Sequence, residues 1–174
     1  MPELISVLDK DAIARYVADV AKQISDDYRE GDLVIIGVLK GAFVFMADLI
    51  RQLTLKSFAI DFIRLASYGD GVDPAGQVRI IHDIETDISN KDVLIVDDIY
   101  DTGGTMTFLC RHLETHRPRT IRICTFIDKT ERRHTPLQPD YACHKIDEGF
   151  LVGYGLDYAE AYRHLPGLYK LTCD

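Results

Sequence analysis

Apolar residues along the chain follow two spacings, and each spacing predicts a different kind of element. A helix is predicted where they recur every three or four positions, at Ile13, Tyr16, Val17, Val20 and Ile24. Asp9 or Asp11 could cap this helix, and Gly31 lies just beyond its end. The run LVIIGVL at 33–39 is apolar throughout, which predicts a strand buried on both faces.

Further segments of both kinds follow along the chain. Helices are predicted for GAFVFMADLIRQL at 41–53 and TGGTMTFLCRHLETH at 102–116, and strands for SFAIDFIRL at 57–65, QVRIIHDI at 77–84, KDVLIVDD at 91–98 and TIRICTFID at 120–128. This order predicts an α/β fold, a mostly parallel twisted sheet with helices on both faces. Ligands of such sheets bind at the carboxyl ends of the strands. The segment SYGDGVDPAG at 67–76 should be an exposed, mobile connection.

Composition places the chain among ordinary globular proteins. Its 174 residues are 47% apolar and 28% charged, which predicts one domain over residues 1–174. No apolar run is long enough to span a bilayer, and the segment MPELISVLDK does not resemble a signal peptide. We therefore expect a cytoplasmic protein.

The net charge of −8 argues against nucleic acid or an anionic membrane as a partner. The densest basic segment, DKTERR at 128–133, mixes both signs of charge. The four cysteines are far apart and have no metal-binding spacing, so we interpret them as free thiols. His112 and His116 are four residues apart but lack the metalloprotease pattern, and we interpret them as cations near the carboxyl end of a helix.

The segment VLIVDDIYDTGGTM at 93–106 carries the clearest chemistry. It predicts a buried strand, then three aspartates, then a glycine turn at the start of a helix. Gly103 and Gly104 would let backbone amides surround a phosphate, while Asp97 and Asp98 could accept from ribose hydroxyls or hold hydrated Mg²⁺. A phosphate beside a diol indicates a phosphorylated ribose.

Other interpretations of this segment are weaker. Asp101 could simply cap the helix that would open at Thr102, on an otherwise ordinary core strand. The segment lacks the G-K-[ST] of a P-loop, and it also lacks the D-x-D-G-T of phosphohydrolases.

The segment VLIVDDIYDTGGT resembles the phosphoribosyl pyrophosphate signature of type I phosphoribosyltransferases, and the whole chain is similar to their hypoxanthine-guanine branch. Further matches are GVLKGAFVFMADL, LASYGDG, FIDKTERR and FLVGYGLDYAEAYR. The resemblance implies that fold with a small base-binding hood, transfer of phosphoribosyl to a 6-oxopurine, Mg²⁺ as cofactor, and a homo-oligomer, either dimer or tetramer. The family often has a glutamate at the position of Asp97 and a lysine at that of Gly104.

The resemblance also implies a role for each matching residue. Those expected to bind phosphoribosyl pyrophosphate are Leu39, Lys40, Gly41, Ser67, Tyr68, Asp97, Asp98, Asp101, Thr102, Gly103, Gly104, Thr105 and Arg163. The purine side is expected to comprise Lys129, Phe150, Leu151 and Asp157, and the metal ligands Asp97, Asp98 and Asp157. A cis peptide bond is implied before Lys40, a lid at Ser67 and Tyr68, and a general base at Asp101.

Two alternatives remain open from the sequence. One is a regulator that binds phosphoribosyl pyrophosphate only as a signal, although such proteins usually show a basic nucleic-acid face. The other is a transferase of the same fold that acts on xanthine, adenine or a pyrimidine.

Overall fold

The computed structural model describes residues 3–67 and 78–172, which form two sheets and three helices. The strands are β1 (Glu3–Leu8), β2 (Leu33–Leu39), β3 (Ala59–Ser67), β4 (Val78–His82), β5 (Asp92–Tyr100), β6 (Thr120–Lys129), β7 (Tyr141–Ile146), β8 (Leu151–Val152) and β9 (Leu168–Thr172). The helices are α1 (Lys10–Asp27), α2 (Phe43–Gln52) and α3 (Gly104–Glu114). The predicted lid residue Tyr68 and the connection that follows it lie outside the described residues.

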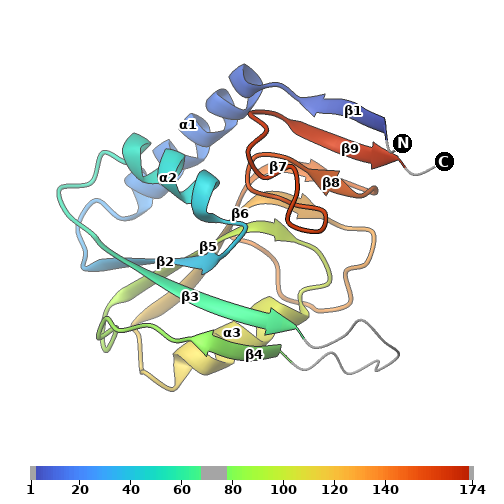
Figure 1. The fold of residues 1–174 in the computed structure, drawn as a ribbon. Helices are drawn as coiled ribbons and strands as arrows, with labels where there is room; N and C mark the ends of the chain where they lie inside the picture. Colours follow the sequence, from blue (N-terminus) through green and yellow to red (C-terminus); the bar gives the residue numbers. More distant parts are fainter. Residues whose placement is uncertain (1–2, 68–77, 173–174) are drawn as a thin grey trace.

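The main sheet has six strands in the order β4-β3-β2-β5-β6-β7. Its neighbours pair in parallel, except that β4 runs antiparallel to β3. Helices α1 and α2 cover one face of this sheet and α3 covers the other (Figure 1). The predicted fold class is therefore confirmed. None of the helices in the described residues is long and apolar enough to cross a membrane.

Helix α1 has the buried face and one of the two caps that the sequence predicted. Asp9 is the N-cap, and its Oδ1 accepts a hydrogen bond of 2.7 Å from the amide of Ala12. The side chains that α1 buries against the sheet include Ile13, Val17, Val20 and Ile24. Removing these side chains from water stabilises the helix far more than its intrinsic propensity does.

A second, smaller sheet is the counterpart of the small hood that the family resemblance implied. Its strand order is β1-β9-β8, and both pairings are antiparallel. The chain therefore begins and ends in the same sheet, as Figure 1 shows at its upper right. The sequence patterns did not predict these three strands or β7.

The path of the chain leaves one natural place for a ligand. From β2 the chain crosses through α2 to β3, whereas from β5 it crosses through α3 to β6 on the other side. The carboxyl ends of β2 and β5 thus lie side by side while their following helices diverge to opposite faces. Open α/β sheets bind ligands at such a switch point.

Candidate active site

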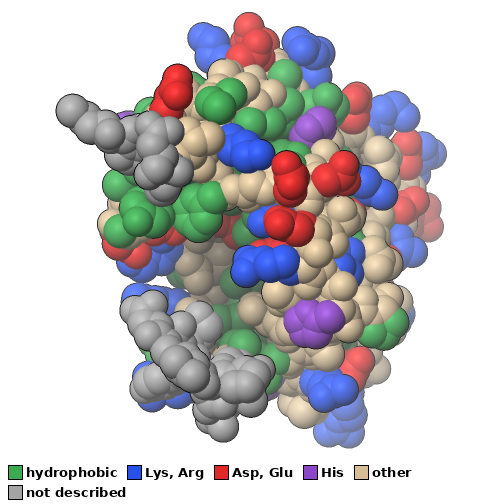
Figure 2. Space-filling view, turned by 90° about the vertical axis from the view of Figure 1, so that its right-hand side faces the viewer, with side chains coloured by type: hydrophobic (Ala, Val, Ile, Leu, Met, Phe, Trp, Pro, Cys, Tyr) green, Lys and Arg blue, Asp and Glu red, His purple; other side chains and the backbone are tan. Residues whose placement is uncertain are grey.

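A cavity of about 450 Å³ lies at the carboxyl ends of β2 and β5. The predicted site residues that line it are Leu39, Lys40, Gly41, Asp97, Asp98, Asp101, Thr102, Gly103, Thr105, Asp157 and Arg163. Gly104, Lys129, Phe150 and Leu151 are not among the residues that line it. In Figure 2, which looks onto this side of the molecule, acidic and basic side chains lie close together in the middle of the face.

Near its carboxyl end, strand β5 places two neighbouring carboxylates, Asp97 and Asp98, at the bottom of this cavity. Asp97 is only 9% exposed, and its Oδ1 accepts a 3.0 Å hydrogen bond from the amide of Asp98. Burial raises the pKa of the Asp97 carboxyl well above its usual range, and the charge of Asp98 raises it further. Burial also raises the pKa of Asp98, an effect that its hydrogen bonds and the positive charge of Arg163 partly offset. The pair favours any cation that can reach both groups.

The turn after β2 packs directly against this pair. A Cβ atom at Gly41 would lie 1.8 Å from Oδ2 of Asp98, so only glycine allows the turn to come this close. The peptide bond between Leu39 and Lys40 is cis, as the family resemblance implied. The Lys40 ammonium lies 2.8 Å from Oε2 of Glu160 and connects this turn to a later loop.

The turn between β5 and α3 has the geometry expected of a phosphate-binding loop. Gly103 has a φ of 87° and is the N-cap of α3, and Thr102 Oγ1 accepts a 3.3 Å hydrogen bond from the amide of Gly104. The first amides of a helix have no acceptor within the helix, so they can donate to an anion at the cavity.

The interpretation of Asp101 as a helix cap is wrong. Helix α3 begins at Gly104, and its N-cap Gly103 makes no side-chain capping bond. Instead, Oδ2 of Asp101 accepts a hydrogen bond from Arg132. Oδ1 of Asp101 is buried and has no hydrogen-bond partner among the described residues. This oxygen can therefore accept a proton or a hydrogen bond from a ligand.

The loop after β8 supplies an acid and a cation to the opposite wall. Arg163 Nη2 lies 2.9 Å from Oδ1 of Asp157, and Nη1 donates a 2.8 Å hydrogen bond to the carbonyl of Gly155. The Nε of Arg163 is buried without a hydrogen-bond partner within residues 3–67 and 78–172. These contacts hold a guanidinium beside the cavity, where it can face an anionic group.

Three of the predicted purine residues, Lys129, Phe150 and Leu151, do not line the cavity, whereas the fourth, Asp157, does. Lys129 ends β6 and is 7% exposed, with its Nζ 3.2 Å from Oε2 of Glu131. Phe150 is 51% exposed and meets Tyr158 edge to face at 5.6 Å. Leu151 is buried in β8. Phe150 thus offers an open ring face, and Lys129 is held by a carboxylate.

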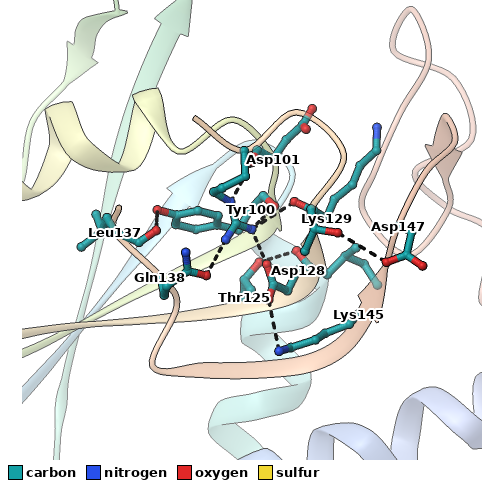
Figure 3. A network of polar contacts seen from close by, with 12 residues as sticks. Tyr100, Asp101, Thr125, Asp128, Lys129, Leu137, Gln138, Lys145 and Asp147 are labelled. Atoms are coloured by element: carbon teal, nitrogen blue, oxygen red, sulfur yellow. Dashed lines mark hydrogen bonds and ion pairs between the residues drawn. The ribbon is translucent and has the colours of Figure 1, made fainter. Parts of the chain in front are cut away.

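Sequence reasoning missed Arg133, whose side chain is only 10% exposed and which links the two sides of the site. Figure 3 shows the surrounding polar network, in which Tyr100, Asp101, Asp128 and Lys129 lie close together. Its Nε donates a 3.1 Å hydrogen bond to the carbonyl of Asp101, and its Nη2 donates a 3.0 Å hydrogen bond to the carbonyl of Lys129. It also pairs with the buried Asp128 and stacks 4.3 Å above the ring of Tyr100. Arg133 therefore holds the backbone of Asp101, the predicted general base, at a fixed distance from that of Lys129, the predicted purine-binding lysine. The only available signal was its place in DKTERR, the densest basic segment of the sequence, which mixes both signs of charge.

Comparison with known proteins identifies the class to which this fold and site belong. Residues 5–159 match the family described as phosphoribosyl transferase domain, so the protein is a phosphoribosyltransferase. The hypoxanthine-guanine phosphoribosyltransferase of Aquifex aeolicus is 41% identical over 166 residues, which cover 95% of this chain and 93% of that protein. The chain belongs to the hypoxanthine-guanine phosphoribosyltransferase family.

Two further relatives agree with this assignment. The hypoxanthine phosphoribosyltransferase of Escherichia coli is 38% identical over 174 residues, covering 98% of this chain and 97% of that protein. A crystal structure of a hypoxanthine-guanine phosphoribosyltransferase from Bacillus anthracis matches with a TM-score of 0.91 at 37% identity, over 99% of this chain and 100% of that chain. The fold and the predicted family are both confirmed.

Asp97→Asn should stabilise the protein in a buffer without divalent cations. Asparagine keeps the oxygen that accepts from the Asp98 amide but removes one of two buried neighbouring charges. We expect the melting temperature near pH 7.5 to rise by roughly 2–8 °C, which corresponds to about 1–2 kcal/mol. Because the raised pKa costs the wild type stability as pH increases from about 4 through that pKa, the gain should shrink in acid.

Asp157→Asn is the matched control, because Asp157 is paired with a cation and its charge is not repelled. Differential scanning calorimetry of both variants provides the comparison. Equal or lower stability of Asp97→Asn at every pH would show that the pair is not under charge repulsion.

The adjacent residues Arg132 and Arg133 should differ sharply in their contribution to stability. Arg133→Gln removes the close partner of the buried Asp128 carboxylate and leaves it only the exposed Lys145 at 4.0 Å, which should cost about 3–5 kcal/mol of unfolding free energy. Arg132→Gln removes a pair whose arginine side chain is 64% exposed, so the cost should stay within about 1 kcal/mol. Urea denaturation measures both, and similar losses would contradict the role assigned to Arg133.

Proposed function

We propose that the protein transfers the phosphoribosyl group of phosphoribosyl pyrophosphate to hypoxanthine and guanine, releasing pyrophosphate and forming the purine nucleotides. The observation that carries this proposal is the single cavity wall formed by the Asp97–Asp98 pair and the turn of Gly103. Amides at a helix start suit a phosphate, and carboxylates suit the hydroxyls of a ribose. The membership of the hypoxanthine-guanine family supports the choice of bases.

Each wall of the cavity suits one part of phosphoribosyl pyrophosphate. The loop from Asp101 to Thr105 would hold the 5′-phosphate through backbone amides and the hydroxyls of Thr102 and Thr105. The turn of Lys40 and Gly41, together with Arg163, would face the pyrophosphate. The ribose would then lie over Asp97 and Asp98.

Residues at the bottom of the cavity fit Mg²⁺ as a cofactor. Asp97 and Asp98 offer hard oxygen ligands, and a bound cation would favour the charged form of both carboxyls, whose pKa is raised by burial. Asp157, across the cavity, would contact a second ion together with pyrophosphate oxygens. Bound Mg²⁺ would supply positive charge that neutralises the leaving pyrophosphate.

The side chains themselves would bind the base and move its proton. Lys129 would donate to the 6-oxo group, Phe150 would stack on the ring, and the backbone beside Leu151 would complete the base edge. As the bond from the anomeric carbon to pyrophosphate breaks and the bond to the purine nitrogen forms, Oδ1 of Asp101 would accept the proton from the purine ring. Arg163 would balance the charge that develops on pyrophosphate.

The regulator considered from the sequence is not favoured, because the relatives compared above are named as transferases along nearly their whole length. A transferase that prefers xanthine differs only in its pocket. The described cysteines Cys110, Cys124 and Cys143 are free thiols, which fits a cytoplasmic location.

We also propose a homo-oligomer, a dimer or a tetramer. Its support is the presence of large apolar side chains exposed on the main sheet and α2, namely Phe43, Ile60, Phe62 and Ile81.

The protein should convert 6-oxopurines and reject adenine, because an ammonium donates to a 6-oxo group but cannot accept from a 6-amino group. Incubation with Mg²⁺, phosphoribosyl pyrophosphate and each base in turn, followed by ultraviolet absorbance, measures this. Lys129→Met should lower kcat/KM for hypoxanthine by at least roughly tenfold, with most of the change in KM. The control is Lys145→Met, which removes an exposed lysine of β7 and should leave kcat/KM unchanged.

Two results would reject parts of this proposal. If no base is consumed while phosphoribosyl pyrophosphate still binds, the protein is the regulator and not a transferase. If Lys129→Met leaves hypoxanthine turnover and affinity unchanged, the base pocket has been assigned to the wrong residue.

Asp101→Asn should separate a catalytic role from a structural one. Asparagine keeps the shape but cannot take a proton, so turnover at saturating substrates should fall roughly 10²–10⁴-fold. The melting temperature should hardly change, because the Arg132 side chain that pairs with Asp101 is 64% exposed and asparagine keeps an oxygen to accept its hydrogen bond. A variant that melts lower but turns over at the normal rate would leave Asp101 only a structural contact.

A further inference from the structure

A second group of metal-ligating side chains lies at the carboxyl-terminal end of α3. We call Asp83, His112 and His116 the His–His–Asp cluster. One ligand atom from each residue lies within 4.8 Å of those of the other two, and no other group of three or more His, Cys, Asp or Glu residues in the described part of the chain is as close. None of the three lines the active-site cavity.

The two histidines share a face of the chain where α3 ends. His112 is in the last turn of the helix, and the amide of His116 donates to the carbonyl of Leu113 at 3.0 Å, which continues the helical path. Their rings therefore meet, with centroids 5.3 Å apart and planes at 69°. Histidines four residues apart on a helix can ligate one ion together.

The third group comes from a distant part of the chain. Asp83 directly follows β4, and both of its oxygens lie 2.9 Å from Nε2 of His112. The amide of Ile84 donates to Oδ1 of Asp83 at 2.8 Å, so the carboxylate is already oriented towards the helix. Burial raises the pKa of Asp83, but the hydrogen bonds from His112 and from the amide of Ile84 outweigh that effect and lower it below its usual value.

We propose that the His–His–Asp cluster binds a divalent ion of the late first transition series, with Zn²⁺ as the ion it suits best. Two imidazoles and one carboxylate are a common three-ligand zinc set, which water completes to a tetrahedron. Zinc bonds of about 2.0–2.2 Å put neighbouring ligand atoms about 3.3 Å apart. In the structure, Nε2 of His112 lies 2.9 Å from Oδ1 of Asp83, and all three ligand atoms lie within 4.8 Å of one another. These distances lie on either side of about 3.3 Å, so small side-chain rotations form the site. Mg²⁺ does not compete, because it prefers oxygen ligands.

A simple ion pair accounts for only part of this arrangement. A protonated His112 beside Asp83 is stabilised by the carboxylate and by the helix dipole. That pair gives no reason for a second imidazole against the same carboxylate. If both rings were protonated, they would repel one another, whereas one zinc ion uses a neutral nitrogen from each ring.

The bound ion would be structural and not catalytic. Helix α3 has 11 residues and is thus about 16 Å long, and its other end carries the phosphate-binding turn. Zinc would cross-link the far end of the helix to the connection between β4 and β5. This proposal does not depend on the purine reaction and would hold for any activity of the cavity.

Thermal unfolding with added zinc tests the site. Metal-free wild-type protein should melt about 5–10 °C higher when free Zn²⁺ is roughly a hundredfold above its dissociation constant. His116→Gln should lose most of this shift and still fold, because His116 is exposed and lies outside the ion pair. His82→Gln is the matched control, an exposed histidine next to Asp83 but outside the cluster, and should keep the full shift.

Titration with Co²⁺ adds a direct readout, because tetrahedral cobalt with nitrogen ligands absorbs strongly in the visible range. The wild type and His82→Gln should give this absorption, and His116→Gln and Asp83→Asn should not. If zinc produces no shift, the cluster is an ion pair only. If the shift and the absorption persist in His116→Gln, the ion binds elsewhere, at the cysteines or at Asp97 and Asp98, and the proposal is wrong.

Discussion

The burial of two neighbouring carboxylates at the end of β5 is the constraint around which this molecule is organised. Asp97 and Asp98 follow four fully buried residues of a central strand, where water is excluded and like charges repel strongly. Within residues 3–67 and 78–172, the fold does not relieve this repulsion with an ion pair to Asp97 or Asp98. Instead it places a glycine turn and a helix start against the pair, so that a cation and a sugar can occupy the remaining space. Without a bound cation, the repulsion between Asp97 and Asp98 therefore destabilises the site.

A second feature of the site is the largely buried cation Arg133, which pairs with Asp128. By donating to the carbonyls of Asp101 and Lys129, it makes the phosphate side and the base side of the site one rigid unit. A lysine could not replace it, because only the planar guanidinium offers donors in several fixed directions. The spacing between the backbones of Asp101 and Lys129 is thus set by one side chain that does not line the cavity.

The sequence predicted those parts of the molecule that depend on local patterns. Apolar runs identified β2, β5 and β6, periodicity and Asp9 identified α1, and the motif at 93–106 identified the residues that share the cavity. It missed β1, β7, β8 and β9, because these strands take their stability from pairing with other strands and not from a local pattern. Asp101 was interpreted as a possible cap because α3 was expected two residues early, before the left-handed Gly103 was known. Arg133 and Asp83 could not be found, since their partners are set by contacts that no spacing reveals.

The pairing of the first strand with the last affects how the protein can be made. During synthesis β1 emerges early, but its only partner in the small sheet is β9, which is made more than 150 residues later. The parallel core can assemble as its own strands are synthesised. Until β9 is made, the apolar residues Leu4 and Ile5 have no neighbouring strand. In a nascent chain, the turn proposed to bind phosphate would thus fold before the small sheet beside Phe150. Truncation before Leu168 should yield a folded core with an unprotected edge, which is a target for chaperones and proteases.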